Sequence, residues 1–193
     1  MNFQYIDIGT SDFSTSIPLL KPGEMGLYVE PIFHYLANLP NLPGVVKAPF
    51  AISDKCGYGT MYYVAENNIH SHQLPQWVRG CNSFNRPHQL LSRELDQSVP
   101  VEKLTVPCIT FEELLRIYHV DTARCLNIDT EGHDHVILAQ VLLFVEKLQV
   151  ERIMFEYIRS NDNVAELDQL LAQFHLLNFT AVTDSDNIIL TRT

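Results

Sequence analysis

The sequence lacks several features that assign a protein to a class directly. No apolar run approaches the ~18 residues of a membrane-crossing helix. The N-terminus has no basic segment followed by an apolar one, which a secretory signal would show. Positive charge is also scarce, because 13 Lys and Arg residues face 23 Asp and Glu residues, for a net charge of −10. Since proteins that follow nucleic-acid phosphates need basic surfaces, we expect a cytoplasmic protein that binds neither nucleic acid nor a membrane.

Cysteine motifs are also missing. The four cysteines are Cys56, Cys81, Cys108 and Cys125, and none forms a C-x-x-C pair. Zinc ribbons and thioredoxin-like redox motifs are therefore unsupported. We expect free thiols in a reducing compartment.

Strand patterns alternate with helical ones along the chain. Strand-like segments lie at 4–8, 26–30, 45–52, 58–65, 124–128 and 150–157, and two more flank the turn at 184–186. Helical patterns lie at 110–118, where Thr110 and Glu113 form a capping box, at 134–147 and from 163 onward. This order predicts one α/β domain over residues 1–193, with a doubly wound, mostly parallel sheet and a C-terminal antiparallel hairpin. Residues 66–100 are polar and read mainly as a long loop or insertion.

The first turn of this sheet, D-I-G-T-S-D-F at 7–13, lies where doubly wound sheets bind ligands, beyond the carboxyl ends of the strands. Glu30 follows Asp7 by 30 − 7 = 23 positions and ends the second strand. A glycine turn followed by an acid at about this distance is the layout of a nucleoside site, in which the acid accepts hydrogen bonds from the ribose hydroxyls.

The turn does not suit a phosphate. A dinucleotide site needs G-x-G-x-x-G, of which only Gly9 is present, and no G-K-[ST] occurs. Asp12 would repel a phosphate but attract a cation. S-adenosylmethionine carries the adenosine without a phosphate and adds a sulfonium and an ammonium group. It is therefore the predicted cofactor. An NAD- or nucleotide-sugar-linked oxidoreductase and a non-catalytic binding subunit remain as alternatives.

Several stretches occur in the order typical of one family: YIDIGTSDFS, GLYVEP, AISDKCGYGTMYYV, RGCNSF, ITFEELL, LNIDTEGHD and RIMFEY. In this respect the chain resembles the FkbM-type methyltransferases, a branch of the S-adenosylmethionine-dependent class I fold. The resemblance implies a seven-stranded Rossmann-like methyltransferase sheet with an antiparallel strand near one edge. One departure is the first turn, which in the family usually reads D-x-G-A-N-x-G.

The resemblance also implies a set of cofactor-binding residues: Asp7, Gly9, Thr10, Ser11, Asp12, Glu30, Pro31, Ala51, Ile52, Ser53 and Asp129. Many relatives have helical structure before the first strand, often covering the cofactor. Here a cover would come from residues 66–100 or from another subunit, so a homo-oligomer stays open.

The stretch D-T-E-G-H-D-H at 129–135 carries the candidate catalytic groups. Asp129 and Glu131 are two positions apart, so in an extended segment both would point the same way. One would hold the methionine amine or the substrate. Glu131 is the first choice for a general base, with His133 next, although Glu131 would also serve to cap the following helix. The alternative for the same Asp, Glu and His residues is a site for Mg²⁺, Mn²⁺ or Zn²⁺. Because the H-E-x-x-H spacing is absent, we predict no protein-bound metal.

Residues 77–88, W-V-R-G-C-N-S-F-N-R-P-H, mix a ring, amides and basic groups, as a carbohydrate site does. The candidate substrate-binding residues are Arg79, Asn82, Ser83 and His88, and the alternative is a purely structural loop. The predicted function is O-methylation of a hydroxyl on a sugar or secondary metabolite, so the partner is a small-molecule or carbohydrate acceptor.

Overall fold

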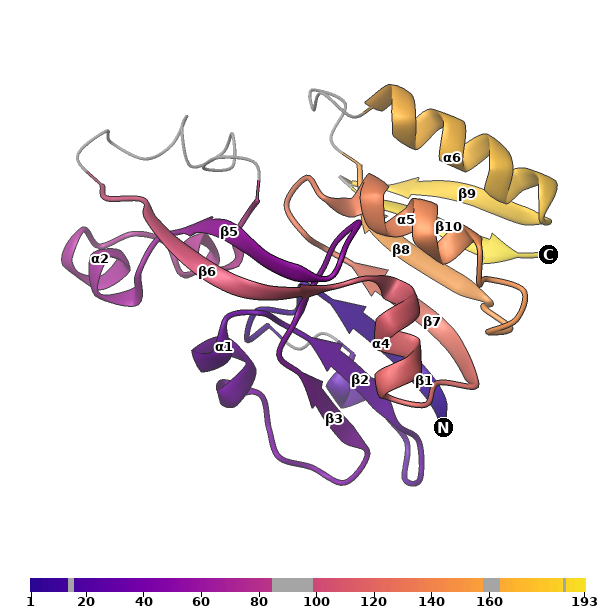
Figure 1. Ribbon diagram of the computed structural model, residues 1–193, viewed down its shortest axis with the longest axis horizontal. Coiled ribbons are helices and arrows are strands. Elements are labelled where there is room, and N and C mark those ends of the chain that lie inside the picture. The colour runs from indigo at the N-terminus through magenta and orange to yellow at the C-terminus, as the bar shows by residue number, and fades with distance from the viewer. Residues whose placement is uncertain (14–15, 85–98, 158–163, 186) are drawn as a thin grey trace.

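The computed structural model describes residues 1–13, 16–84, 99–157, 164–185 and 187–193 (Figure 1). Within this part of the chain, seven strands form one sheet in the order β3-β2-β1-β7-β8-β10-β9. Their bounds are Val45–Ala48 (β3), Gly26–Val29 (β2), Asn2–Ile8 (β1), Thr122–Ile128 (β7), Arg152–Glu156 (β8), Asn187–Arg192 (β10) and Phe179–Asp184 (β9). The first five run parallel, and β10 is antiparallel to both β8 and β9. The predicted mostly parallel sheet with a C-terminal hairpin is confirmed.

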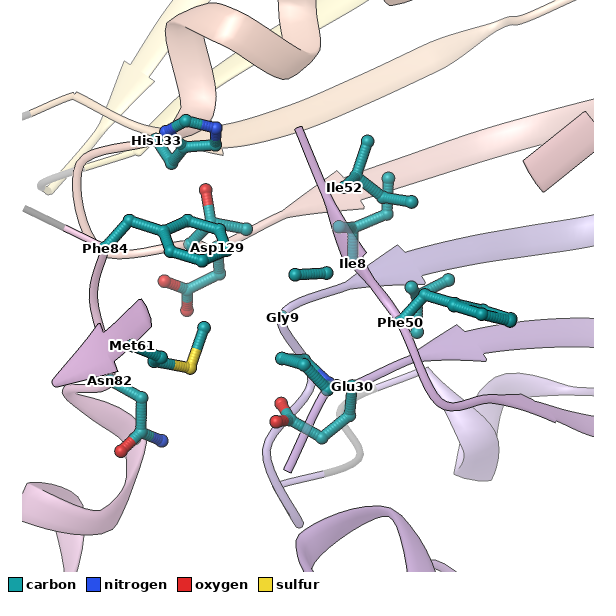
Figure 2. Close-up of a pocket in the computed structure, with 15 residues that line it drawn as sticks. Ile8, Gly9, Glu30, Phe50, Ile52, Met61, Asn82, Phe84, Asp129 and His133 are labelled. Atoms are coloured by element: carbon teal, nitrogen blue, oxygen red, sulfur yellow. The ribbon is translucent and has the colours of Figure 1, made fainter. Parts of the chain in front are cut away.

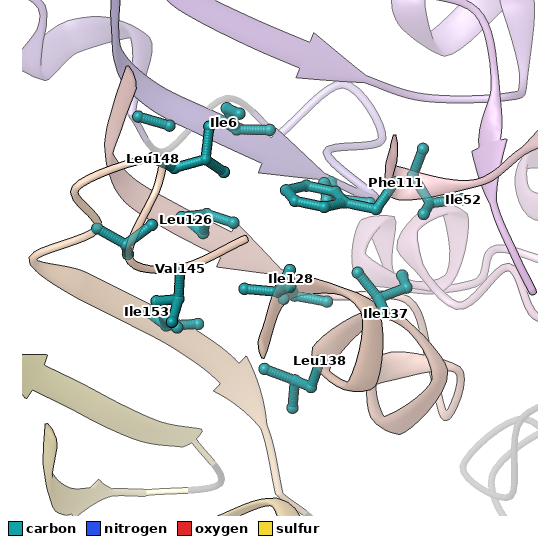
Figure 3. Packing of buried hydrophobic residues seen from close by; sticks show 14 of the residues in the cluster. Ile6, Ile52, Phe111, Leu126, Ile128, Ile137, Leu138, Val145, Leu148 and Ile153 are labelled. Atoms are coloured by element: carbon teal, nitrogen blue, oxygen red, sulfur yellow. The ribbon is translucent and has the colours of Figure 1, made fainter. Parts of the chain in front are cut away.

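One face of this sheet carries most of the core. The helices α4 (Phe111–Ile117), α5 (Asp134–Leu142) and α6 (Val164–Leu176) pack on it through their apolar sides. Figure 3 shows the pattern, with Ile6 and Leu126 of the strands facing Val145 and Leu148, which follow α5. Removing such side chains from water is the main force that holds the layers together. No helix in the described residues is long and apolar enough to cross a bilayer.

The opposite face is covered unevenly. The 3-10 helix η1 (Ile17–Leu19) and helix α1 (Phe33–Asn38) meet it around Tyr28, which is fully buried. Helices therefore lie on both faces, as a doubly wound sheet requires. Nearer the middle of the sheet, Cys125 of β7 and Met154 of β8 remain partly exposed on this face.

A second, three-stranded sheet stands beside the first, in the order β4-β6-β5. Its strands are Ala51–Ile52 (β4), Glu102–Ile109 (β6) and Gly57–Tyr63 (β5). The prediction of one strand over 45–52 is wrong, because Pro49 interrupts it and the halves join different sheets. Strand β6 was not predicted.

The segment 66–100 is not simply a loop. Residues Glu66–Ser71 form helix α2 and Gln76–Gly80 form the 3-10 helix η2, while 85–98 lie outside the described residues. The structure contains one of the two hydrogen bonds of the capping box before α4. The Thr110 hydroxyl accepts a hydrogen bond from the Glu113 backbone N–H at 3.1 Å. The Glu113 carboxylate instead accepts one from the Arg116 guanidinium at 2.7 Å.

Candidate functional site

The turn after β1 requires a glycine for two reasons. Gly9 has φ +81°, in the left-handed region that favours glycine. A Cβ added there would lie 1.9 Å from the backbone oxygen of Asp129. The Asp129 backbone N–H donates to the Ile8 carbonyl at 2.9 Å, so the two strand ends are tied together at this point. Gly9 thus lets the β1 turn touch the end of β7.

Glu30 is held at the end of β2 by backbone groups. Its Oε2 accepts a hydrogen bond from the Ser11 N–H, and its Oε1 accepts one from the Ile32 N–H, both at 2.8 Å. Because each carboxylate oxygen has two lone pairs, each can still accept one more hydrogen bond. Burial raises the pKa of Glu30 to about 7, although the two backbone hydrogen bonds act in the opposite direction.

Glu30 lines a cavity between the strand ends and the second sheet, which we call the Glu30 cavity (Figure 2). Six predicted cofactor residues meet there: Gly9, Glu30, Pro31, Ala51, Ile52 and Asp129. No Lys or Arg is among the described residues that line it. Its volume is about 30 Å³, far below the several hundred Å³ of a typical small-molecule site. A nucleoside therefore enters only if the walls move apart.

A second cavity, the Glu131 cavity, lies on the other side of the contact between Gly9 and Asp129 and shares both residues with the first. It has a volume of about 250 Å³. The other predicted site residues that line it are Asp7, Thr10, Ser11 and Glu131. The two cavities together bring nine of the predicted cofactor-binding residues to one edge of the sheet, with the predicted site residues Asn82, Glu131 and His133 beside them.

Carboxyl groups with raised pKa values concentrate around the Glu131 cavity. Burial raises the pKa of Asp7 to about 6, against hydrogen bonds from Ser16 and Asn127 that lower it. Burial also raises the pKa of Asp129. For Glu131, burial and then the neighbouring carboxyl groups, first that of Glu156, raise the pKa well above its ordinary value. The pKa values of these groups all lie above those of ordinary carboxyl groups.

The backbone at Glu131 differs from the prediction. We expected an extended segment, but Glu131 has φ +53° and Gly132 has φ +97°. The chain therefore turns sharply before α5, and the Ser83 hydroxyl donates to the Glu131 carbonyl at 2.8 Å. Asp129 lines both cavities, whereas Glu131 is found only in the wall of the second.

His133 lies in the wall of the Glu30 cavity. Its Nε2 is 3.4 Å from the hydroxyl oxygen of Ser53, and its ring meets that of Phe84 with 5.2 Å between centroids. Burial, with a smaller contribution from His135, lowers the pKa of His133 to about 4. The imidazole is therefore neutral at physiological pH. Among the described residues no group of three or more His, Cys, Asp or Glu side chains is arranged to hold a metal ion.

Asp12 and Arg79 pair with each other and line neither cavity. The Arg79 Nε is 3.0 Å from Asp12 Oδ1, and the guanidinium lies 4.5 Å from the centre of the Phe13 ring. The negative charge that we expected to attract a ligand is thus neutralised within the chain. The pair instead ties η2 to the β1 turn.

The remaining predicted substrate residues have different places. Asn82 lines the Glu30 cavity, Ser83 supports the Glu131 backbone, and His88 lies outside the described residues. Residues missed from the sequence include the apolar wall formed by Phe50, Met61 and Phe84. The alternation of apolar residues in β6 was the available signal for the second sheet, whose strand β5 carries Met61.

The seven-stranded sheet, with the antiparallel strand β10 next to the edge strand β9, agrees with the sheet that the sequence predicted. No protein-family model matches the chain, and no curated protein matches it. Among solved structures, the chain is similar to a ribosomal protein L11 methylase from Lactobacillus delbrueckii subsp. bulgaricus. The identity is 10%, the TM-score is 0.41, and the match covers 100% of this chain and 72% of the other.

Proposed function

We propose that this chain binds S-adenosylmethionine and transfers its methyl group. The observation that carries the proposal is the Glu30 cavity itself. Its wall contains the buried Glu30 carboxylate at the end of β2 and the Gly9 turn. None of the described residues that line it is Lys or Arg. A site for a nucleoside attached to a phosphate would need cationic groups or a glycine-rich turn. This site suits an adenosine that carries a positive charge.

The residues present fit such a cofactor. Glu30 would accept hydrogen bonds from the ribose, and the adenine would rest against the apolar side chains of Phe50 and Ile52. Asp129 lines both cavities, so its carboxyl group would face the cationic end. When bound, the cofactor supplies an electrophilic methyl group on a sulfonium.

The Glu131 cavity is the place we assign to the methyl acceptor, a hydroxyl of a sugar or secondary metabolite. Amide groups of Asn127 and Asn187 line it, and these suit a substrate with several hydroxyls. Glu131 is the proposed base, because it lines this cavity and an ionised carboxylate whose pKa is raised is a stronger proton acceptor than an ordinary one. His133, neutral and in the adjoining cavity, is the second candidate.

Membership of the FkbM-type methyltransferases is part of the proposal. It is supported by the sequence D-T-E-G-H-D and by the place of Asp129 at the meeting point of the two cavities. An NAD-linked oxidoreductase is disfavoured, because the turn around Gly9 lacks the further glycines that a pyrophosphate needs. A non-catalytic binding subunit would keep the Glu30 cavity but show no transfer.

The test is calorimetric titration with S-adenosylmethionine, S-adenosylhomocysteine and NAD. The first two should bind and NAD should not. In Glu30→Gln the affinity should fall by roughly 2 kcal/mol, about 30-fold, since an amide nitrogen, which cannot accept a hydrogen bond, replaces one of the two carboxyl oxygens. Glu66→Gln, on exposed helix α2, is the matched control and should bind like the wild type. Binding of NAD alone, or equal binding by the Glu30→Gln variant, would contradict the proposal.

A further inference from the structure

Helix α5 is apolar on two sides. Its inner side packs on the sheet through buried residues of the core. Its outer side carries Val136 and Ala139, and the stripe continues to Leu143 just after the helix, which is 77% exposed. The spacing of three and then four positions places these side chains on one helix face. A surface helix usually presents charged groups there, but α5 contains no Lys, Arg or Glu, and Asp134 is buried.

The outer stripe of α5 lines a groove, which we call the α5 groove. Helix α5 lies between α4 and α6 and contacts both of them (Figure 1). The groove between these helices has a volume of about 580 Å³, more than twice that of the Glu131 cavity. Phe144 and Leu170 extend its apolar lining. This volume lies in the range of cavities that bind ligands or side chains of a partner.

Gln140 keeps the α5 groove open on the side of α4. Its Oε1 accepts a hydrogen bond from the Phe111 backbone N–H at 2.9 Å, and its Nε2 donates to the Ser53 carbonyl at 3.0 Å. Gln140 itself lines the groove. Because it ties α5 to the start of α4 and to the residue after β4, the groove is part of the folded framework.

The charge around the α5 groove is of one sign. Asp54, Glu112 and Glu166 line it, and none of the described lining residues is Lys or Arg. Within the described part of the chain, none of these three carboxylates forms an ion pair. Burial lowers the pKa of His135, so its imidazole is neutral at physiological pH. An occupant therefore meets an apolar lining together with negative charge.

We propose that the α5 groove binds an amphipathic helix of a partner protein, with an apolar stripe against Leu143 and Lys or Arg beside the carboxylates. Helices that bind in grooves use apolar anchors at spacings of three and four, the same spacing as the stripe on α5. A second copy of this chain, with a net charge of −10, would bring like charge to the groove. An anionic lipid surface would be repelled for the same reason.

The test is fluorescence anisotropy with a labelled model helix that has leucine at spacings of three and four and lysine elsewhere. The wild type should bind it. Leu143→Gln should weaken binding about tenfold, because an exposed apolar anchor is lost. Glu166→Lys should weaken it about fivefold through charge reversal. Leu176→Gln, at a position 81% exposed and outside the groove lining, is the matched control and should bind like the wild type.

Three comparisons make the result specific. Circular dichroism of all variants should match that of the wild type, so that weaker binding does not reflect unfolding. A peptide with glutamate in place of lysine should not bind. Absence of binding to the wild type, equal binding by Leu143→Gln, or equal binding of a peptide with alanine in place of leucine would overturn the proposal. Sedimentation that shows a wild-type dimer dissociated by Leu143→Gln would also overturn it, since a second copy would then occupy the groove. None of these measurements uses S-adenosylhomocysteine, so the proposed function is tested separately.

Discussion

The two sides of the Glu30 cavity are built differently. One side consists of strand ends and the Gly9 turn, where backbone meets backbone and the carboxyl groups are buried. The other side is the segment from Arg79 to Phe84, held to β5 by one pair of backbone hydrogen bonds, to the β1 turn by the Asp12–Arg79 pair and to the Glu131 carbonyl by the Ser83 hydroxyl. The first side is rigid because strands continue into it. The second is attached by few contacts, so it is the side that would yield when a ligand enters.

The largest expected effect is on the rigid side. Gly9→Ala should lower the free energy of unfolding by about 3–5 kcal/mol, since the left-handed backbone penalty adds to an overlap with the Asp129 carbonyl. Gly23→Ala is the control, with φ +90° and nothing within 4 Å of the added Cβ, and should cost only about 1–2 kcal/mol. Urea denaturation measures both. Equal losses in the two variants would show that the close approach at Gly9 is not rigid.

The second prediction concerns pH. The pKa of folded Glu30 is raised to about 7 from an ordinary 4.5, so between these values the folded protein holds a proton that the unfolded chain releases. Stability should therefore fall as pH rises from about 4.5 to about 7. Glu30→Gln should remove about 3 kcal/mol of this fall. The measurement is the free energy of unfolding of the wild type and of Glu30→Gln across this pH range. The same slope against pH in both proteins would contradict the prediction.

The third prediction concerns the side of the cavity that the Asp12–Arg79 pair holds to the β1 turn. Arg79→Ala should lower the free energy of unfolding by about 1–2 kcal/mol, because the Asp12 side chain is only 9% exposed and loses its cation. Arg124→Ala is the matched control, since its pair with Glu151 is more than half exposed on both sides and is worth at most about 0.5 kcal/mol. Chemical denaturation of both variants tests the difference, and a loss in Arg79→Ala no larger than the control would contradict it.

The smallest effect is expected at Gly59. A Cβ there would lie 2.6 Å from the Phe84 ring, the far end of a side chain that can turn, and 2.9 Å from the Cys108 sulfur, so both contacts are with side chains rather than with backbone. Gly59→Ala should cost only about 1 kcal/mol, while the shifted ring alters binding of S-adenosylhomocysteine. Calorimetry and urea denaturation together separate the two effects. A loss as large as that of Gly9→Ala would mean that the two sides are equally rigid.

The difference between the two sides of the cavity also explains which parts of the site could be predicted from the sequence. Gly9, Glu30 and Asp129 were predictable because each lies at the end of an apolar strand, where local pattern and spacing are sufficient. The second sheet was not, because β5 pairs with β6 across about 40 intervening residues. Pro107 inside β6 also argued against a strand. It is accommodated because β4 pairs only with the next two residues, Cys108 and Ile109.

Side-chain partners were harder still to foresee. Nothing local indicates that Arg79 would neutralise Asp12, since the two are brought together only by the docking of η2 on the β1 turn. The left-handed backbone at Glu131 also has no clear signal beyond the glycine that follows it. Contacts of this kind depend on how distant segments meet, and a pattern along the chain does not contain that information.

The position of Cys81 beside Asn82 gives the molecule a built-in chemical reporter. Cys81 is 4% exposed, and burial raises the pKa of its thiol, so in the closed form it should resist alkylation. Cys56 is exposed and serves as an internal reference for the reagent. The rate at which the reagent labels Cys81, measured relative to Cys56, would therefore report how often the segment beside the Glu30 cavity opens.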